Sequence, residues 1–292
     1  MKNRQSGGVK HRQLDTALGL DARSGPIALI GRLVLYGLLV LVFAGPLLAL
    51  LVSAFSPVSD PTRLTLLPTH FTLANFEAAF DRDVLRYLLN SFLVVGGGLL
   101  LQIGVSISAA YALARKRFPG LRLVFLLILS TMMLPEEVLA IPLSLVLSDL
   151  SLTGSLWGMI VPVGAWAFSI LVTAEFMKEI PLELEEAARL DGAGDLRIFW
   201  SVVLPLCRPA LGVIGIFGFT MIWDQYMLPL LVATDAKQFT LPLALRTLRA
   251  DEQVGVGVLL ASALLALLPS VLAFLAMQRQ FMRGLTSGAV KG

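Results

Sequence analysis

The sequence predicts an all-α, polytopic membrane protein with about six transmembrane helices. Apolar residues make up 57% of the 292 residues and charged residues only 15%, against about 25% charged in a typical soluble domain. The mean hydropathy is +0.82, and the charges are grouped between long uncharged runs. Those runs show no polar face at a 3.6-residue period, which the helices of a soluble bundle would need.

Six apolar segments reach the roughly 20 residues that a membrane-spanning helix requires. They are Leu33–Phe55, Tyr87–Leu113, Leu123–Leu147, Ser155–Phe176, Pro209–Val232 and Gly255–Met277. The third segment contains the polar run Pro135–Glu137, and the fifth contains Trp223–Gln225. The second carries small residues at Gly96–Gly98, Gly104 and Ser108, which allow close helix packing within the chain or with a partner.

The distribution of Lys and Arg predicts the topology, because these residues gather on the cytoplasmic side of a membrane. With a cytoplasmic N-terminus, the four inner pieces hold 6, 4, 4 and 3 of them, which is 17 of the 23. We therefore predict a cytoplasmic leader (1–32), a six-span domain (33–279) with a cytoplasmic loop (178–208), and a cytoplasmic tail (280–292). The polar leader is too long for the basic start of a signal peptide.

Several classes of function lack the residues that they need. Cys207 is the only cysteine, and His11 and His70, both outside the apolar segments, are the only histidines. The chain therefore has too few cysteines and histidines for a typical metal site or for histidine-based catalysis, and we expect neither. The net charge of +3 is not concentrated on a basic face of the kind that binds nucleic acid. No Gly-Lys-Ser/Thr occurs, so we expect no ATP-binding loop on this chain.

The polar loop between the fourth and fifth segments predicts a helical hairpin. Pro181 suits a first helical position, and three glutamates follow in the first turns, where the helix dipole favours anions. Gly192 and Gly194 permit a turn at positive φ. A second short amphipathic helix is expected over Leu196–Val203. Such a hairpin is either a rigid knob that transmits a partner's movement or a hairpin lying at the membrane surface with no partner.

The hairpin sequence resembles the coupling motif of the membrane subunits of ABC importers. In that motif EAA is followed by three residues and Gly, and then by nine residues before an aliphatic residue, any residue and LP. Here Glu186–Ala188 is followed by Gly192 and then by Val202 and Leu204-Pro205. The Leu-Asp-Gly-Ala version of the motif at Leu190–Ala193 is similar to that of the carbohydrate-uptake branch of the family.

Three further places resemble the same branch. Trp223–Tyr226 with Pro229-Leu230 is similar to its Trp-Asn-aromatic-Pro-Leu pattern, with Asp in the usual Asn position. Leu268-Pro269 matches its last span, and Gly284–Gly292 is close to its C-terminal ending. The chain thus looks like the shorter of the two permeases of a maltose-type sugar importer. That resemblance implies a type I ABC importer permease fold.

The resemblance also implies partners and a place in the cell. The partners are a second, longer permease, a dimer of ATPase subunits at the cytoplasmic face, an extracytoplasmic binding protein, and the lipid of a bacterial or archaeal inner membrane. This chain would bind no cofactor and not be an enzyme, since ATP and Mg would sit on the ATPase. The expected ATPase-coupling residues are Glu185, Glu186, Ala187, Ala188, Leu190, Asp191, Gly192 and Ala193. The tail would add Gly284, Leu285, Thr286, Ser287 and Lys291.

Polar and aromatic side chains within the apolar segments are the candidates for a solute path, because intramembrane polar groups are costly without a role. The candidates are Glu136, Glu137, Asn90, Trp166, Trp223, Asp224, Gln225 and Tyr226. Carboxylates and amides can accept hydrogen bonds from sugar hydroxyls, and aromatic rings can stack on sugar faces. Alternatively these residues satisfy one another or bend a helix. The competing function is a proton-coupled secondary transporter that uses Glu136, Glu137 or Asp224 as a relay.

Overall fold

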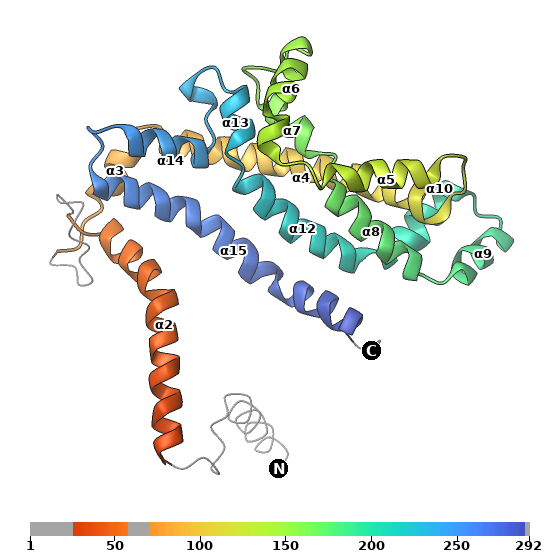
Figure 1. The fold of residues 1–292 in the computed structure, drawn as a ribbon, viewed down its shortest axis with the longest axis horizontal. Helices are drawn as coiled ribbons and strands as arrows, with labels where there is room; N and C mark the ends of the chain where they lie inside the picture. The colour runs from red at the N-terminus through yellow and green to blue at the C-terminus, as the bar shows by residue number, and fades with distance from the viewer. Residues whose placement is uncertain (1–25, 58–69, 290–292) are drawn as a thin grey trace.

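The computed structural model describes residues 26–57 and 70–289, and every regular element in these two ranges is a helix. The elements are α2 (Pro26–Ala54), α3 (Ala74–Phe80), α4 (Val84–Arg115), α5 (Leu121–Thr131), α6 (Glu136–Asp149), α7 (Leu156–Val163), α8 (Ala167–Glu179), α9 (Leu182–Leu190), α10 (Asp195–Ile198), the π-helix η1 (Phe199–Val203), α11 (Leu204–Leu206), α12 (Arg208–Trp223), α13 (Met227–Val232), the 3₁₀-helix η2 (Ala236–Gln238), α14 (Leu241–Ala250) and α15 (Val256–Ala289). Figure 1 shows an elongated bundle with α9 and α10 at one end, here the α9 end, and α3 and α14 at the other, the α14 end.

The helices confirm a polytopic protein with about six spans. Four stretches are long and apolar enough to cross a membrane: Leu29–Ala54, Val84–Arg115, Leu156–Glu179 and Val256–Ala276. Two more pass the same test only as bent pairs, α5 with α6 and α10–α11 with α12, which gives up to six spans. The apolar segments of the sequence therefore predict these candidate spans, but two of them are sharply bent pairs of helices.

The predicted third segment is the largest departure from a straight span. It folds as α5 and α6, and the helix direction bends by 108° between them. Pro135, the last residue before α6, has no N–H to donate and disfavours helical geometry at the residue before it, so the helix cannot continue through it. As a result Glu136 and Glu137 form the first turn of α6 instead of lying midway along an unbroken helix.

The fourth and fifth predicted segments each contain a further break. The fourth segment breaks between α7 and α8, where a Cβ on Gly164 would lie 2.5 Å from the side chain of Leu101. Any larger residue there would force the Leu101 side chain of α4 to shift. The fifth segment breaks after Trp223, and α13 begins again at Met227.

Helix α4 is the centre of the bundle, because α7, α8 and α12 all pack against it. Gly97 and Gly98 face Ile160 and Val163 of α7 at distances that leave no room for a Cβ, so these glycines serve packing within the chain. Gly104 is different, since no atom lies within 4 Å of where its Cβ would be. The glycines of α4 therefore divide into a packed pair, Gly97 and Gly98, and two open positions, Gly96 and Gly104, of which Gly104 lies nearer the α9 end.

At the α14 end, polar side chains hold the connecting segments on the bundle. The Asn90 amide donates to the backbone oxygens of Lys237 and Phe239, at 2.9 and 3.0 Å. The Asn75 amide donates to the backbone oxygens of Ala54 and Ser56, at 3.0 and 2.8 Å, which ties α3 to the end of α2. These amides satisfy backbone groups that no helix satisfies.

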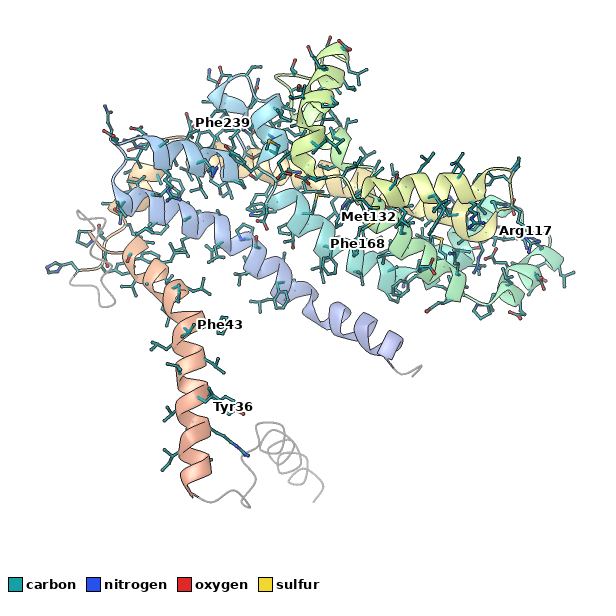
Figure 2. The ribbon with its side chains drawn as sticks, viewed as in Figure 1. Tyr36, Phe43, Arg117, Met132, Phe168 and Phe239 are labelled. Atoms are coloured by element: carbon teal, nitrogen blue, oxygen red, sulfur yellow. The ribbon has the colours of Figure 1, made fainter. Side chains whose placement is uncertain are left out.

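Helix α2 stands apart from the bundle and meets it only near the α14 end, where it packs on α15 (Figure 1). Only 6% of the residues in its most apolar stretch are buried. Phe43, about halfway along the helix, is 74% exposed and lies clear of the other helices (Figure 2). Such a surface needs lipid or another chain around it. The helix begins at Pro26, inside the predicted leader, whose residues 1–25 lie outside the described part of the chain.

Candidate coupling surface and translocation path

The loop between α8 and α12 is a helical hairpin, as its sequence predicts. Helix α9 begins at Leu182, and Pro181 is its N-cap with ψ 131°, one residue before the position expected for it. The turn closes with a hydrogen bond of 2.9 Å from the Ala193 N–H to the Ala188 oxygen. Gly192 has φ +83°, so the prediction of positive φ is right there. It is wrong at Gly194, which has φ −74°.

The second arm of the hairpin is longer than the predicted Leu196–Val203 and is not a regular α-helix. It runs through α10, η1 and α11, and η1 is a π-helix. Because a π-helix pairs residues five apart, Ile198 and Val203 reach the same side, and both are fully buried. They pack with Ile107 and Ala110 of α4, so the π-helical turn fixes the hairpin to the central helix.

A buried ion pair ties the first arm to the same helix. Arg115, the last residue of α4, places Nε 2.6 Å from Oε1 of Glu185, and the two side chains are only 5% and 1% exposed. The N–H does not point along this line, so the contact is an ion pair and not a formed hydrogen bond. Arg115 Nη2 also donates to the backbone oxygen of Ile180 at 2.7 Å. Glu185 thus faces the bundle and is not part of the exposed surface of the hairpin.

The exposed side of α9 combines acidic and apolar side chains. Glu183, Glu186, Ala187 and Leu190 are exposed, unlike Glu185, and Leu190 is 90% exposed. Asp191 and Gly192 continue this side, while Ala188 and Ala193 are half-buried against the hairpin's apolar core. Leu196 and Trp200 on the second arm are also exposed. Exposed leucines beside carboxylates form a surface suited to a protein partner.

A second, exposed set of charges crosses the base of the hairpin. Lys116 donates to Oδ2 of Asp195 at 2.5 Å, and Arg189 Nη2 lies 3.7 Å from Oδ1 of the same carboxylate. The hydrogen bond from Lys116 lowers the pKa of Asp195, and the same bond raises the pKa of Lys116. Together with the Arg115–Glu185 pair, these contacts join both arms of the hairpin to the end of α4.

The breaks in three helices meet around one cavity of about 350 Å³. Glu136 comes from the α5–α6 break, Trp166 from the α7–α8 break and Gln225 from the α12–α13 break, and all three line it. The structure thus brings together three of the eight path candidates from segments far apart in the sequence. The rest of the lining is mostly apolar, with Met132 and Met221 among residues that sequence reasoning missed. Broken helix ends beside a cavity leave backbone groups free to bind a polar solute.

The other five candidates lie elsewhere. Trp223 is buried with its indole N–H donating to the Ala266 oxygen at 3.1 Å, and the Asn90 amide is engaged at the α14 end. Tyr226 has the guanidinium of Arg246 4.7 Å above its ring. Glu137 and Asp224 are exposed and do not line the cavity. Trp223 and Asn90 therefore have structural partners in this conformation.

The expected tail contacts fall on the last turns of α15. Gly284, Leu285, Thr286 and Ser287 are helical, so the predicted tail begins as a continuation of the sixth span. Lys291 lies outside the described residues.

The fold and the hairpin define the class of protein: a polytopic helical membrane protein with a structured helical hairpin at one end of its bundle. Residues 102–286 match the family described as binding-protein-dependent transport system inner membrane component, and the chain belongs to that family. It is the channel-forming permease subunit of a binding-protein-dependent importer and not a catalytic subunit. Membership implies, in general terms, a partner permease, an ATPase and a binding protein.

Individual relatives agree with this assignment. The diacetylchitobiose uptake system permease protein NgcG of Streptomyces coelicolor is 30% identical over 89% of this chain and 87% of its own. The sn-glycerol-3-phosphate transport system permease protein UgpE of Yersinia pestis bv. Antiqua is 38% identical over 68% of this chain and 71% of its own. A crystal structure of a bacterial ABC transporter involved in alginate import has the same fold, with TM-score 0.77, 23% identity, and coverage of 88% and 98%. The family assignment favours an ATP-driven importer over the proton-coupled secondary transporter.

Proposed function

We propose that this chain carries an uncharged, polyhydroxylated solute such as a sugar across the inner membrane, driven by a separate ATPase that docks on α9. The observation that carries the proposal is the hairpin. Its exposed side presents Glu186 and Leu190, while the Arg115–Glu185 pair behind it holds it rigidly on α4. A force applied to the exposed side therefore reaches the central helix without being lost in a flexible loop.

In the proposed cycle ATP and Mg stay on a dimer of ATPase subunits, and closure of that dimer moves the hairpin. The hairpin is continuous with α12 and attached to α4, so both helices move with it. The solute arrives from an extracytoplasmic binding protein. A second, longer permease covers the open side of the path and the exposed apolar surface of α2.

The cavity chemistry supports the solute class. Glu136 is the only charged residue among its described lining residues, and no Lys or Arg lines it. A carboxylate repels a phosphate ester but accepts hydrogen bonds from hydroxyl groups, which Gln225 can also donate to and accept from. Trp166 offers a ring face for a sugar. These groups favour a neutral polyol or sugar over a glycerophosphate.

The proposed orientation places both termini and the α9 end in the cytoplasm, as the Lys and Arg distribution indicates. The native cysteine, Cys207, is buried, so introduced cysteines can be labelled selectively. An impermeant thiol reagent added to intact cells should label a Glu252→Cys variant and not a Leu190→Cys variant. The reverse pattern would refute the orientation.

We also propose that the C-terminal end touches the ATPase pair, on the basis of its match to the family ending. Deletion of Leu285–Gly292 should lower ATPase coupling while the permease still inserts in the membrane. Full coupling by the truncated transporter would show that the segment is dispensable.

The docking proposal is tested by charge reversal at Glu186. If Glu186 pairs with a cation of the ATPase in a buried contact, Glu186→Lys costs about 3–5 kcal/mol of binding free energy. The ATPase should then be lost when the permease is purified, and uptake should fail in the same cells. Glu252→Lys makes the same charge change on an exposed residue at the α14 end and should leave both intact. Normal ATPase recovery with Glu186→Lys would refute the docking site.

A further inference from the structure

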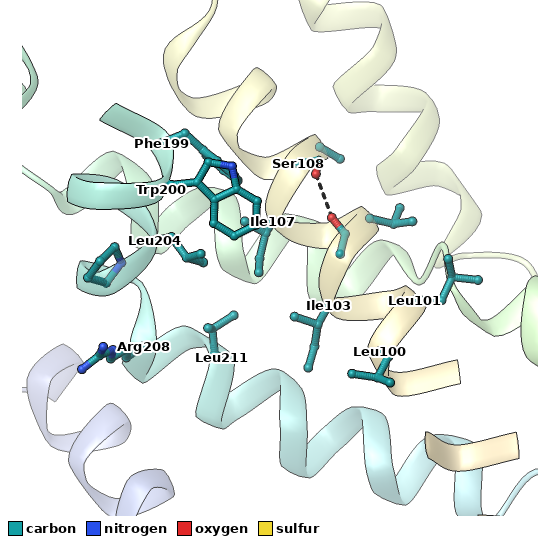
Figure 3. A pocket seen from close by; sticks show the side chains of 14 residues that line it. Leu100, Leu101, Ile103, Ile107, Ser108, Phe199, Trp200, Leu204, Arg208 and Leu211 are labelled. Carbon is teal, nitrogen blue, oxygen red and sulfur yellow. Dashed lines mark hydrogen bonds between the residues drawn. The ribbon is translucent and has the colours of Figure 1, made fainter. Parts of the chain in front are cut away.

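A second, larger cavity of about 1160 Å³ lies outside the proposed solute path, between α4 and the η1–α12 segment (Figure 3). Its floor is the side of α4 that carries Gly104, where a Cβ would meet no atom within 4 Å. Ser108 lies on the same floor, but its hydroxyl donates to the Gly104 oxygen at 2.8 Å and is therefore satisfied internally. The floor of this groove is thus apolar and open.

The length of the groove matches one leaflet of a bilayer. Its α4 floor runs from Leu100 to Ala109, which corresponds to about 14 Å at 1.5 Å per residue. The hydrocarbon core of a membrane is about 30 Å thick, so one leaflet contributes about 15 Å. A spanning helix from a partner would need the full thickness. The length of the groove instead matches one acyl chain that lies within its leaflet.

The two ends of the groove differ in polarity. Arg208 and Trp200 lie at one end, beside the hairpin, while Leu100 and Leu101 lie at the other (Figure 3). Trp200 is 64% exposed, and Arg208 is exposed and forms no ion pair with any side chain in the described ranges. Tryptophan and arginine at one level of a membrane protein are typical of the headgroup region. The guanidinium can bind two phosphate oxygens at once.

We propose that this groove is a binding site for an anionic phospholipid of the leaflet at the α9 end. One acyl chain lies along the Gly104 face of α4, and the headgroup phosphate rests on Arg208. The lipid would contact α4, η1 and the start of α12 together, which are the elements that join the hairpin to the bundle. Charge complementarity and the one-leaflet length favour a lipid over a helix of the second permease.

The test is lipid binding to the complete purified transporter after delipidation, measured by native mass spectrometry with added phosphatidylglycerol or phosphatidylcholine. Wild type should retain phosphatidylglycerol at least fivefold more tightly than phosphatidylcholine. Arg208→Gln should remove this preference, and Arg197→Gln, an exposed arginine outside the groove lining, should leave it unchanged. Gly104→Leu should fill the groove and weaken binding of both lipids, at a position where an added Cβ would have no atom within 4 Å.

Three outcomes would overturn the proposal. Equal phosphatidylglycerol binding by wild type and Arg208→Gln would remove the headgroup assignment. Unchanged binding by Gly104→Leu would show that the acyl chain lies elsewhere. Loss of the second permease from purified Gly104→Leu transporter would show that the groove is a helix–helix interface and not a lipid site.

Discussion

The hairpin at the α9 end and the cavity in the middle of the bundle both lie where helices break. They differ in how many of their polar side chains have a partner within the chain. In the hairpin, Glu185, Arg189, Lys116 and Asp195 each have a charged partner within the chain. Around the cavity, the side chains of Glu136 and Gln225 have no hydrogen bond or ion pair with the described residues. The hairpin pairs the charges that attach it to α4, whereas the cavity leaves the polar side chains of its lining available.

This difference separates two requirements of a permease. A coupling element must keep its shape under force, which paired charges and a buried apolar core provide. A solute path must exchange partners in each cycle, and side chains without internal partners can form hydrogen bonds with a solute and release them. Substitutions should therefore have larger effects on structure in the hairpin and larger effects on kinetics at the cavity.

The largest effect is expected from breaking the buried ion pair. Arg115→Leu removes the closest partner of the buried Glu185 carboxylate and leaves only the half-exposed Arg189, 3.6 Å away, at a cost of up to about 3–5 kcal/mol. The hairpin should detach from α4, become sensitive to proteolysis near Leu190, and fail to support uptake. Arg117→Leu, two residues on and exposed, is the matched control and should behave as wild type.

A double variant distinguishes lost structure from an unpaired charge. Arg115→Leu combined with Glu185→Leu removes both charges, and such replacements are often neutral or stabilising. Protease resistance of the hairpin should return in the double variant. If it stays as sensitive as the single variant, the ion pair is not what holds the first arm in place.

A smaller effect is expected at the turn of the hairpin, where two glycines provide a matched pair. At both Gly192 and Gly194 an added Cβ would have no atom within 4 Å, so a new side chain meets no clash at either. Only Gly192 has positive φ, and Gly192→Val should therefore cost about 1–3 kcal/mol of backbone strain. Gly194→Val should be tolerated. Equal thermal stability and uptake for the two variants would contradict the role of φ.

The smallest effect on stability, and the clearest on kinetics, is expected at the first turn of α6. Glu136 lines the cavity and Glu137 does not. Glu136→Leu should remove a solute hydrogen bond worth about 0.5–1.5 kcal/mol, which is about a two- to tenfold rise in the KM for uptake. Glu137→Leu should change KM much less. A larger change at Glu137 than at Glu136 would mean that the cavity is not the path.

Local patterns predicted much of this structure. The apolar segments placed the spans, and the motif around Gly192 placed the hairpin turn. The inward rotation of Glu185 was not predictable, because its partner, Arg115, lies 70 residues earlier in the chain. The same limit applies to Asn90 and Trp223, whose partners are backbone oxygens of distant segments. The π-helical turn also gives no local signal, since it is required by packing on α4.

The chain direction changes by 70° at Cys207, between the second arm of the hairpin and α12. If the two segments move as one rigid unit, a rotation of the hairpin about this bend also rotates α12. Helix α12 has 16 residues, so it measures about 24 Å and its far end moves about 0.4 Å for each degree of rotation. That far end carries Gln225 at the cavity. A tilt of about 10° would therefore shift the cavity wall by about 4 Å, roughly one heavy-atom contact distance. Small movements at the ATPase would thus become solute-sized movements in the membrane.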